Sequence, residues 1–139
     1  MTQARPLSVL FACNHNAVRS PMAAALLEQA TGGRVRASSC GVLAAEELDP
    51  FAQAVMTEAG LDLGGHAPRS FEAAGGQWDL VVALTPEADA RAGVLSPEAH
   101  EFWPVDDPTT SEGAREQRLE AYRAVRDDLR RRILARFGA

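Results

Sequence analysis

The sequence predicts an α/β fold in which a single domain holds a four-stranded parallel sheet with helices on both faces. Short apolar runs alternate with longer helical segments along the chain, and this alternation is typical of parallel strands joined by crossover helices. The length of 139 residues suits one domain with a substantial core, so we expect a single domain over residues 1–139. No internal repeat, low-complexity tract or linker interrupts the pattern.

The first half of the chain holds two of the expected strands. Residues 8–12 predict a buried strand, because residues 9–12 are apolar. Residues 21–30 predict a helix with Ser20 as its N-cap and Pro21 at its first position. A second short strand is expected at 35–39. A helix follows at 51–59 and ends at Gly60, a residue that readily adopts the conformation of a helix end.

The second half supplies the other two strands and the longest helix. Residues 80–84 predict the third strand, Pro86 begins a short helix, and residues 101–103 predict the last strand. Residues 114–137 predict one long helix, because apolar residues recur three or four positions apart: Leu119, Tyr122, Val125, Leu129 and Ile133. Residues 41–50, 61–78 and 104–113 are expected to be loops, and loops of this length are often functional.

Composition narrows the classes of partner and compartment. The net charge of −5 argues against a nucleic-acid partner, and no run of 18 apolar residues predicts a membrane span. The first residues lack the pattern of a signal peptide. Two cysteines, Cys13 and Cys40, are too few for a disulfide framework, so we expect a reducing, cytoplasmic location.

A thiol and a guanidinium lie six positions apart where the first strand gives way to the first helix. Cys13 follows the strand directly, and Arg19 precedes Ser20 and Pro21 at the expected helix start. Backbone amides of such a loop, together with the helix dipole, bind a tetrahedral oxyanion, and Arg19 can hold two of its oxygens. The same positive field favours the thiolate form of Cys13, which makes it a nucleophile aimed at phosphorus.

The spacing of Cys13 and Arg19 is by itself a weak signal, because a small buried cysteine and a surface arginine would give the same pattern. The preceding apolar strand, Ser20 and the proline-initiated helix favour a phosphate-binding loop. We therefore predict that this loop consists of eight residues: Cys13, Asn14, His15, Asn16, Ala17, Val18, Arg19 and Ser20. His15 is expected to point out of the loop.

The chain resembles the low-molecular-weight protein tyrosine phosphatases and the arsenate reductases built on the same fold. The stretch CNHNAVRSPMA is similar to their phosphate loop, and ASSCGV, GLDLGGHAPRSF, WDLVVALT and WPVDDPTT are similar to later segments of the family. The resemblance covers nearly the whole chain and implies a low-molecular-weight phosphatase-like fold. It also implies that neither a cofactor nor a metal is needed.

The resemblance assigns a general acid and a supporting network. Asp107, directly before Pro108, matches the family's acid, although an Asp-Asp-Pro sequence alone more often begins a turn. The four residues that match the family's supporting network are Asn16, Ser20, Ser39 and His66. On spacing alone, His66 reads equally well as a surface loop residue and Ser39 as an ordinary residue at a strand end.

The sequence differs from the pattern of the family in three places that affect the expected substrate. Phosphatases of this family usually carry tyrosine after the Asp-Pro pair, whereas Thr109 and Thr110 stand here, so the pocket lacks an aromatic wall for a phenyl ring. The segments WPVDDP and VRDDLRRR look more like the reductases, but the cysteines of their thioredoxin relay are missing. Cys40 is expected to be a small packing residue rather than a redox partner of Cys13.

Two enzymatic readings therefore stay open. The first is a phosphomonoester hydrolase acting on a phosphorylated protein or a small phosphate ester through a cysteinyl-phosphate, and Pro21 is the residue that phosphatases favour. The second is an arsenate reductase that takes arsenate and an external thiol such as mycothiol or glutathione. A non-catalytic oxyanion-binding module is a third reading, which the set of Cys13, Arg19 and Asp107 argues against.

Overall fold

Four parallel strands form the centre of the molecule, in the order β2-β1-β3-β4. The computed structural model describes residues 6–138. The strands are β1 (Ser8–Cys13), β2 (Arg36–Gly41), β3 (Leu80–Ala83) and β4 (His100–Phe102). The predicted α/β fold with a four-stranded parallel sheet is confirmed, and the strand ends differ from the expected ones by a residue or two.

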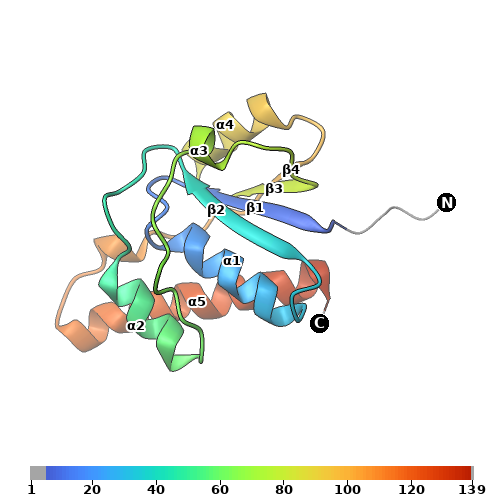
Figure 1. Cartoon of the computed structure of the whole chain (residues 1–139). Helices are drawn as coiled ribbons and strands as arrows, with labels where there is room; N and C mark the ends of the chain where they lie inside the picture. Colours follow the sequence, from blue (N-terminus) through green and yellow to red (C-terminus); the bar gives the residue numbers. More distant parts are fainter. Residues whose placement is uncertain (1–5, 139) are drawn as a thin grey trace.

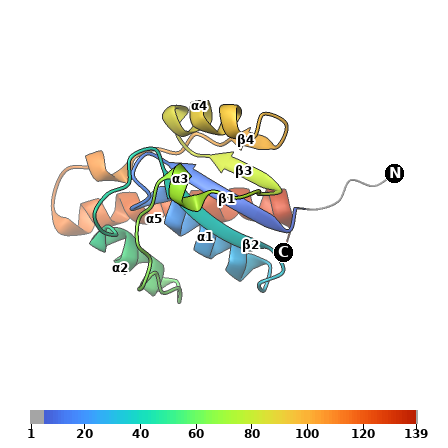
Figure 2. The same ribbon diagram turned by 45° about the horizontal axis from the view of Figure 1, so that its top comes forward.

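Helices cover both faces of the sheet (Figures 1 and 2). One layer contains α1 (Arg19–Ala30), α2 (Pro50–Glu58) and α5 (Arg115–Phe137), and the other contains α3 (Phe71–Ala74) and α4 (Pro86–Leu95). Successive strand residues point to opposite faces, so β1 contributes Val9 and Phe11 to the core under α1 and α5, and Leu10 and Ala12 to the other core. The carboxyl ends of β1 and β3 meet at one edge, which is where such sheets place their sites.

The first helix corrects the sequence prediction, because it begins at Arg19 rather than at Pro21. Its N-cap is Val18, which has no side chain able to accept a hydrogen bond, and Ser20 lies within the first turn. Ser20 is therefore not the N-cap, since its hydroxyl is turned to the thiol of Cys13 instead. The first amides of α1 thus lack a side-chain cap and are left for another acceptor.

Two further elements lie in segments that were expected to be irregular. α3 is a single turn inside residues 61–78, begun by Ser70, whose hydroxyl accepts from the amide of Ala73 at 3.2 Å. The short 3₁₀ helix η1 (Pro108–Thr110) lies inside residues 104–113 and is capped by Asp107. Both begin with local side-chain caps, which periodicity over such short stretches does not reveal.

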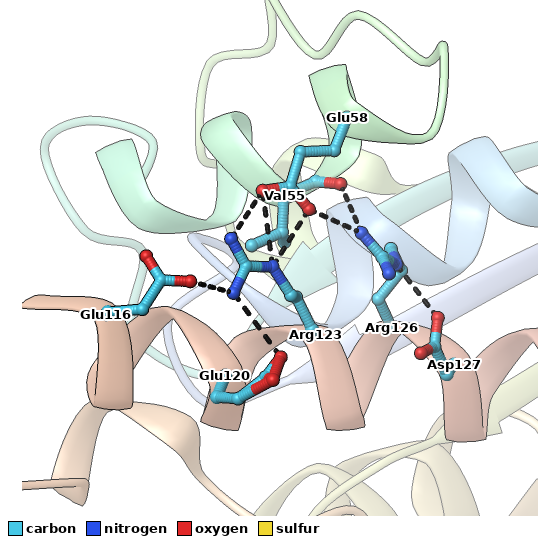
Figure 3. Close-up of polar contacts among 7 residues, drawn as sticks. All are labelled: Val55, Glu58, Glu116, Glu120, Arg123, Arg126 and Asp127. Atoms are coloured by element: carbon cyan, nitrogen blue, oxygen red, sulfur yellow. Dashed lines mark hydrogen bonds and ion pairs between the residues drawn. The ribbon is translucent and has the colours of Figure 1, made fainter.

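A group of ion pairs fixes α2 against α5 (Figure 3). Arg123 donates to both oxygens of Glu58 and Arg126 donates to one of them, and Arg126 also reaches the carbonyl of Val55 at 2.8 Å. The hydrogen bonds from Arg123 are the largest cause of the lowered pKa of Glu58, which is about 2. Each exposed pair stabilises the fold little, but together they set the position of α2, whose N-terminal end borders the site described below.

None of the helices within residues 6–138 combines the length and the apolar character that crossing a membrane requires.

Candidate active site

The loop between β1 and α1 curls around the end of the first strand. Cys13 ends β1 with only 2 % of its surface exposed, and α1 begins at Arg19. Asn16 has a φ of 56°, and it is the only residue other than glycine within residues 6–138 that has a positive φ. Asparagine tolerates this left-handed conformation better than most residues, which lets the loop close into a ring.

The backbone carbonyls of this loop face outward and are occupied. Amides of the following segment donate to four of them, and His66 Nε2 donates to the fifth at 3.0 Å. The four amide bonds are Val42 to Cys13 (3.0 Å), Leu43 to Asn14 (2.8 Å), Ala45 to His15 (2.9 Å) and Asp49 to Ala17 (3.1 Å). The amides of residues 14–18 donate to no acceptor in the part of the chain that the structure describes. This arrangement is a nest that suits an oxyanion.

Asn16 and Ser20 connect the loop to the thiol. Asn16 Nδ2 donates to Ser20 Oγ at 2.9 Å, and Ser20 Oγ lies 3.0 Å from Cys13 Sγ. The amide of Arg69 donates to Asn16 Oδ1 at 2.9 Å, so both ends of the asparagine side chain are held. Because Ser20 Oγ accepts from Asn16, its single hydrogen is shared between the carbonyl of Cys40, 3.2 Å away, and Cys13. When this hydrogen points at the sulfur, it stabilises a thiolate.

The expected supporting network is thus assembled in part. Asn16, Ser20 and His66 lie together around the loop. Ser39 is buried on β2, but no hydrogen bond within residues 6–138 joins its hydroxyl to the other three. Instead, its backbone carbonyl accepts from Arg69 Nε at 3.0 Å.

Two residues of the site were missed from the sequence. Arg69 ties the segment after His66 to β2, through Ser38 and Ser39, as well as holding Asn16. Thr85 caps α4 and donates from its hydroxyl to Asn14 Oδ1 at 2.7 Å. The signals were a His-x-x-Arg spacing and a threonine directly after the third strand and before a proline, both visible in the printed sequence.

Arg19 and Asp107 approach each other beside the thiol. Arg19 is 8 % exposed, and its Nη1 donates to the carbonyl of Val105 at 3.1 Å. Arg19 Nη2 lies 4.0 Å from Asp107 Oδ2. The hydrogen bond to Val105 anchors the guanidinium to the loop that carries Asp107, and it leaves the Nε and Nη2 edge for the two oxygens of an anion.

Asp107 is held as a carboxylate. Partial desolvation raises the pKa of Asp107, but the hydroxyl and the amide of Thr109, which donate to Oδ1 at 2.6 and 2.9 Å, and the charge of Arg19 outweigh it. The pKa of Asp107 therefore lies below its ordinary value. Its second oxygen, Oδ2, is the one that faces Arg19.

These side chains border one cavity of about 280 Å³. It is lined by Cys13, His15, Ala17, Val18, Arg19, Ala45, Glu47, Leu48, Asp49, Pro50, Asp107 and Thr109. His15 lines it too, and its Nδ1 donates to the carbonyl of Leu43, which lies outside the loop. Asp106 is not among the lining residues, whereas Asp107 is. The residues that line the cavity include no Phe, Tyr or Trp, as the threonines after the Asp-Pro pair led us to expect.

Cys40 lies on the other side of the sheet from Cys13. In the register of β1 and β2, Cys40 pairs with Ala12 and packs with it in the core under α3 and α4, whereas Cys13 packs in the opposite core. Burial, followed by the charge of Cys13, raises the pKa of Cys40 to about 12. The geometry favours a packing role, because a disulfide to Cys13 would require the strands to rearrange.

Gly41 fits under the loop because it has no side chain. A Cβ there would lie 2.8 Å from the amide nitrogen of Asn16 and 2.9 Å from the carbonyl carbon of His15. We expect Gly41→Ala to displace the loop, to destabilise the protein by about 1–3 kcal/mol, and to weaken phosphate binding by about tenfold as its amides move out of line. Urea unfolding and the inhibition constant of inorganic phosphate measure the two effects.

Gly93→Ala is the matched control for this change. Gly93 lies within α4, and a Cβ there would meet only the ring of His100 at 3.6 Å, an ordinary contact. This control should keep wild-type phosphate binding and gain a little stability, since alanine favours a helix more than glycine does. Unchanged phosphate affinity in Gly41→Ala would show that the loop does not depend on the close approach of β2.

Comparison with known proteins places these features in a family. The family model described as low molecular weight phosphotyrosine protein phosphatase matches residues 8–135. A glutaredoxin arsenate reductase of Synechocystis is 31 % identical over 132 residues, covering 90 % of this chain and 92 % of that protein. A protein-arginine-phosphatase of Geobacillus stearothermophilus is 32 % identical over 137 residues, covering 89 % of each. An arsenate reductase solved in its phosphate-binding state superposes with a TM-score of 0.72 at 28 % identity, covering 92 % of this chain and 94 % of that one.

Proposed function

Because the chain belongs to the low molecular weight phosphotyrosine protein phosphatase family, we propose that it hydrolyses phosphate monoesters through a cysteinyl-phosphate intermediate. The observation that carries this proposal is the meeting of a thiol, a guanidinium and a carboxyl group in one cavity, at Cys13, Arg19 and Asp107. Transfer of a phosphoryl group from an alcohol oxygen to water uses a nucleophile, a group that binds the phosphoryl oxygens and an acid. Binding an anion alone needs no acid.

In the first half of the reaction the ester bond is replaced by a bond to sulfur. The loop amides and Arg19 hold the non-bridging oxygens, and the Cys13 thiolate attacks phosphorus from the side opposite the leaving oxygen. As the phosphorus–oxygen bond breaks, Asp107 gives its proton to that oxygen, so an alcohol leaves and a carboxylate remains. Ser20 keeps its hydrogen bond to sulfur and offsets the charge of the thiolate before attack.

In the second half, water breaks the new bond. The Asp107 carboxylate accepts a proton from a water molecule that attacks phosphorus opposite to sulfur. The sulfur–phosphorus bond breaks, Cys13 leaves as a thiolate stabilised by Ser20, and inorganic phosphate is released. Asp107 is protonated at the end of this step, and it then passes the proton to the departing phosphate or to solvent, so the enzyme returns to its starting carboxylate state.

The lowered pKa of Asp107 bears on where the first proton comes from. In the free protein Asp107 is a carboxylate at neutral pH, because Thr109 and Arg19 stabilise that form. A phosphate monoester that binds as its monoanion brings the missing proton with it, and the proton then moves to Asp107. Since the second ionisation of such esters lies near pH ~6, kcat/KM should fall as the pH rises above this value.

Arsenate reduction is the second candidate, and the carboxylate state of Asp107 favours it. Hydroxide leaves arsenic without the strong acid that an alkoxide requires. Cys13 would attack arsenic(V) and displace hydroxide, after which an external thiol and Cys13 would be oxidised to a mixed disulfide as arsenic(V) becomes arsenic(III). The thiol must be external, because Cys40, the other cysteine of the chain, lies across the sheet. Both reactions need reduced Cys13, so we propose a cytoplasmic location.

A side-by-side assay tests the proposed function. We expect the wild-type protein to hydrolyse p-nitrophenyl phosphate faster than it reduces arsenate with thioredoxin, glutathione or mycothiol supplied. Cys13→Ser should abolish either reaction, whereas Cys40→Ala, its matched control, should keep nearly full activity because Cys40 lies outside the cavity. Arsenate reduction without phosphate hydrolysis would place the reductase first. Loss of activity in Cys40→Ala with an intact fold would contradict the assignment of the nucleophile.

A further inference from the structure

Two arginines stand over one phenyl ring at the start of α5. The guanidinium carbon of Arg118 lies 4.7 Å from the centre of the Phe51 ring, and that of Arg115 lies 5.1 Å from it. Within residues 6–138 neither guanidinium has a carboxylate within ion-pair distance, unlike Arg123 and Arg126 further along the same helix. The pair is thus a local concentration of positive charge in a protein whose net charge is −5.

The pair does not line the cavity that contains Cys13, but it stacks on a residue that directly follows a lining segment. Phe51 directly follows Asp49 and Pro50, which line that cavity, and α5 begins shortly after Thr109, which lines it from the other side. Both ribbon views show α2 beside the first turns of α5 (Figures 1 and 2). A substrate group that extends from the cavity past Asp49 and Pro50 would come to this pair.

The ring beneath the pair is itself fixed in place. Phe51 packs edge to face against Tyr122, with ring centres 5.4 Å apart. Tyr122 is 1 % exposed, and its hydroxyl donates to Asp49 Oδ2 at 2.9 Å. Asp49 accepts this bond and those from the amides of Phe51 and Ala52, and within residues 6–138 no ion pair joins it to either arginine.

Stacking leaves the edge of a guanidinium free to bind. A ring under the flat face of arginine holds the group by a cation–π contact, while the N–H donors in its plane stay available to an oxyanion. Such a group is already ordered, so binding a carboxylate or a phosphate costs less conformational entropy than it would at a freely moving side chain.

We propose that Arg115 and Arg118 recognise a second anionic group, a carboxylate or a phosphate, carried by the substrate next to the phosphoryl group that is cleaved. The inference rests on the proposed hydrolase function and names its preferred substrate class: phosphate esters with an additional negative charge. Glu47 on the cavity wall and the net negative charge of the protein repel a second anionic group elsewhere around the cavity. The arginine pair is therefore expected to decide whether substrates with a second negative charge bind better than neutral ones.

The test compares two double variants that remove the same charge. Arg115→Gln/Arg118→Gln removes the pair. Arg34→Gln/Arg130→Gln removes two exposed arginines that do not contact Phe51, one between α1 and β2 and one in the C-terminal half of α5. Each is assayed on p-nitrophenyl phosphate and on two phosphopeptides of equal length, one with glutamates and one with glutamines beside the phosphorylated residue.

We expect the first double variant to lose about tenfold in kcat/KM on the acidic peptide, mainly through KM, and the loss to shrink as salt is added. On p-nitrophenyl phosphate and on the neutral peptide it should stay within about twofold of wild type, and the control double variant should do so on every substrate. A sugar bisphosphate compared with its monophosphate shows whether a small molecule is the source of the second anion instead. Equal losses on acidic and neutral peptides, or the same loss in the control, would overturn the proposal.

Failure of the hydrolase function is read separately from failure of this inference. If wild-type protein hydrolyses none of the esters, the proposed function is wrong. Binding of the fluorescently labelled acidic peptide is then measured with Cys13→Ser protein, with and without the two arginines. We expect the arginines to strengthen this binding about tenfold, and equal binding with and without them refutes the role of the pair.

Discussion

Replacing Arg19 by lysine is expected to lower kcat/KM for phosphate esters by about 100-fold or more. Lysine keeps the positive charge, but it cannot present two parallel N–H donors to two oxygens of the transferring phosphoryl group. Arg19 is also held by the carbonyl of Val105 at 3.1 Å, so its fork is aimed before substrate arrives. A lysine ammonium has no second donor in that plane, and most of the loss should appear in kcat.

Steady-state kinetics with p-nitrophenyl phosphate measure the effect, and circular dichroism checks the fold. Arg36→Lys is the matched control, because Arg36 is exposed at the far end of β2 from the loop. Near-normal turnover in Arg19→Lys would show that charge alone is sufficient, and the bidentate role argued above would then be wrong.

The layout of strands and helices could be predicted because it depends on patterns that are local in the sequence. β1 and β3 are buried on both faces and appear as unbroken apolar runs. α5 shows its buried face as residues three or four apart, and its bounds agree with the prediction to one residue. Short elements escaped, since α3 and η1 are single turns whose caps are local side-chain contacts.

The predicted phosphate-binding loop could also be found from a local pattern, whereas the side chains that hold the loop in place could not. Cys13 and Arg19 are close in the sequence, and their spacing alone suggests an anion site. The amide of Arg69 meets Asn16 across 53 positions of sequence, and Thr85 meets Asn14 across 71. Such contacts depend on how β2, β3 and the segment after His66 come together, which no local pattern encodes. Ser39 is the opposite case: its match to the family suggested a contact with the loop, but within the described residues 6–138 no hydrogen bond joins its hydroxyl to the loop.

Phe51 shows that an aromatic residue close to the cavity in the sequence need not contact the substrate. Phe51 is the aromatic side chain next to the cavity-lining segment, yet its ring packs against Tyr122 and beneath Arg118. The cavity itself is bordered by small and aliphatic side chains such as Ala45, Leu48 and Pro50. A substrate therefore gains little from a phenyl ring here, and charge next to the phosphoryl group becomes the feature by which substrates differ.

Asp107→Asn separates the two candidate reactions. An alkoxide is a poor leaving group and needs a proton in the transition state, which asparagine cannot supply. We expect kcat to fall on the order of 100-fold for an alkyl phosphate and much less for p-nitrophenyl phosphate, whose leaving group is stable as an anion. Arsenate reduction with a thiol donor should change little, because hydroxide leaves arsenic readily.

Asp107→Asn should lower KM, whereas a variant that merely lost structure would raise it. Removing the carboxylate 4.0 Å from Arg19 removes a negative charge from the place where a phosphate binds, so KM and the inhibition constant of phosphate should both fall. Asp106→Asn is the matched control, since Asp106 is the neighbouring carboxylate and does not line the cavity. Hydrolysis that stays at wild-type rates for good and poor leaving groups alike would make Asp107 only the cap of η1. The hydrolase mechanism would then have no acid, and arsenate reduction would become the better account of Cys13 and Arg19.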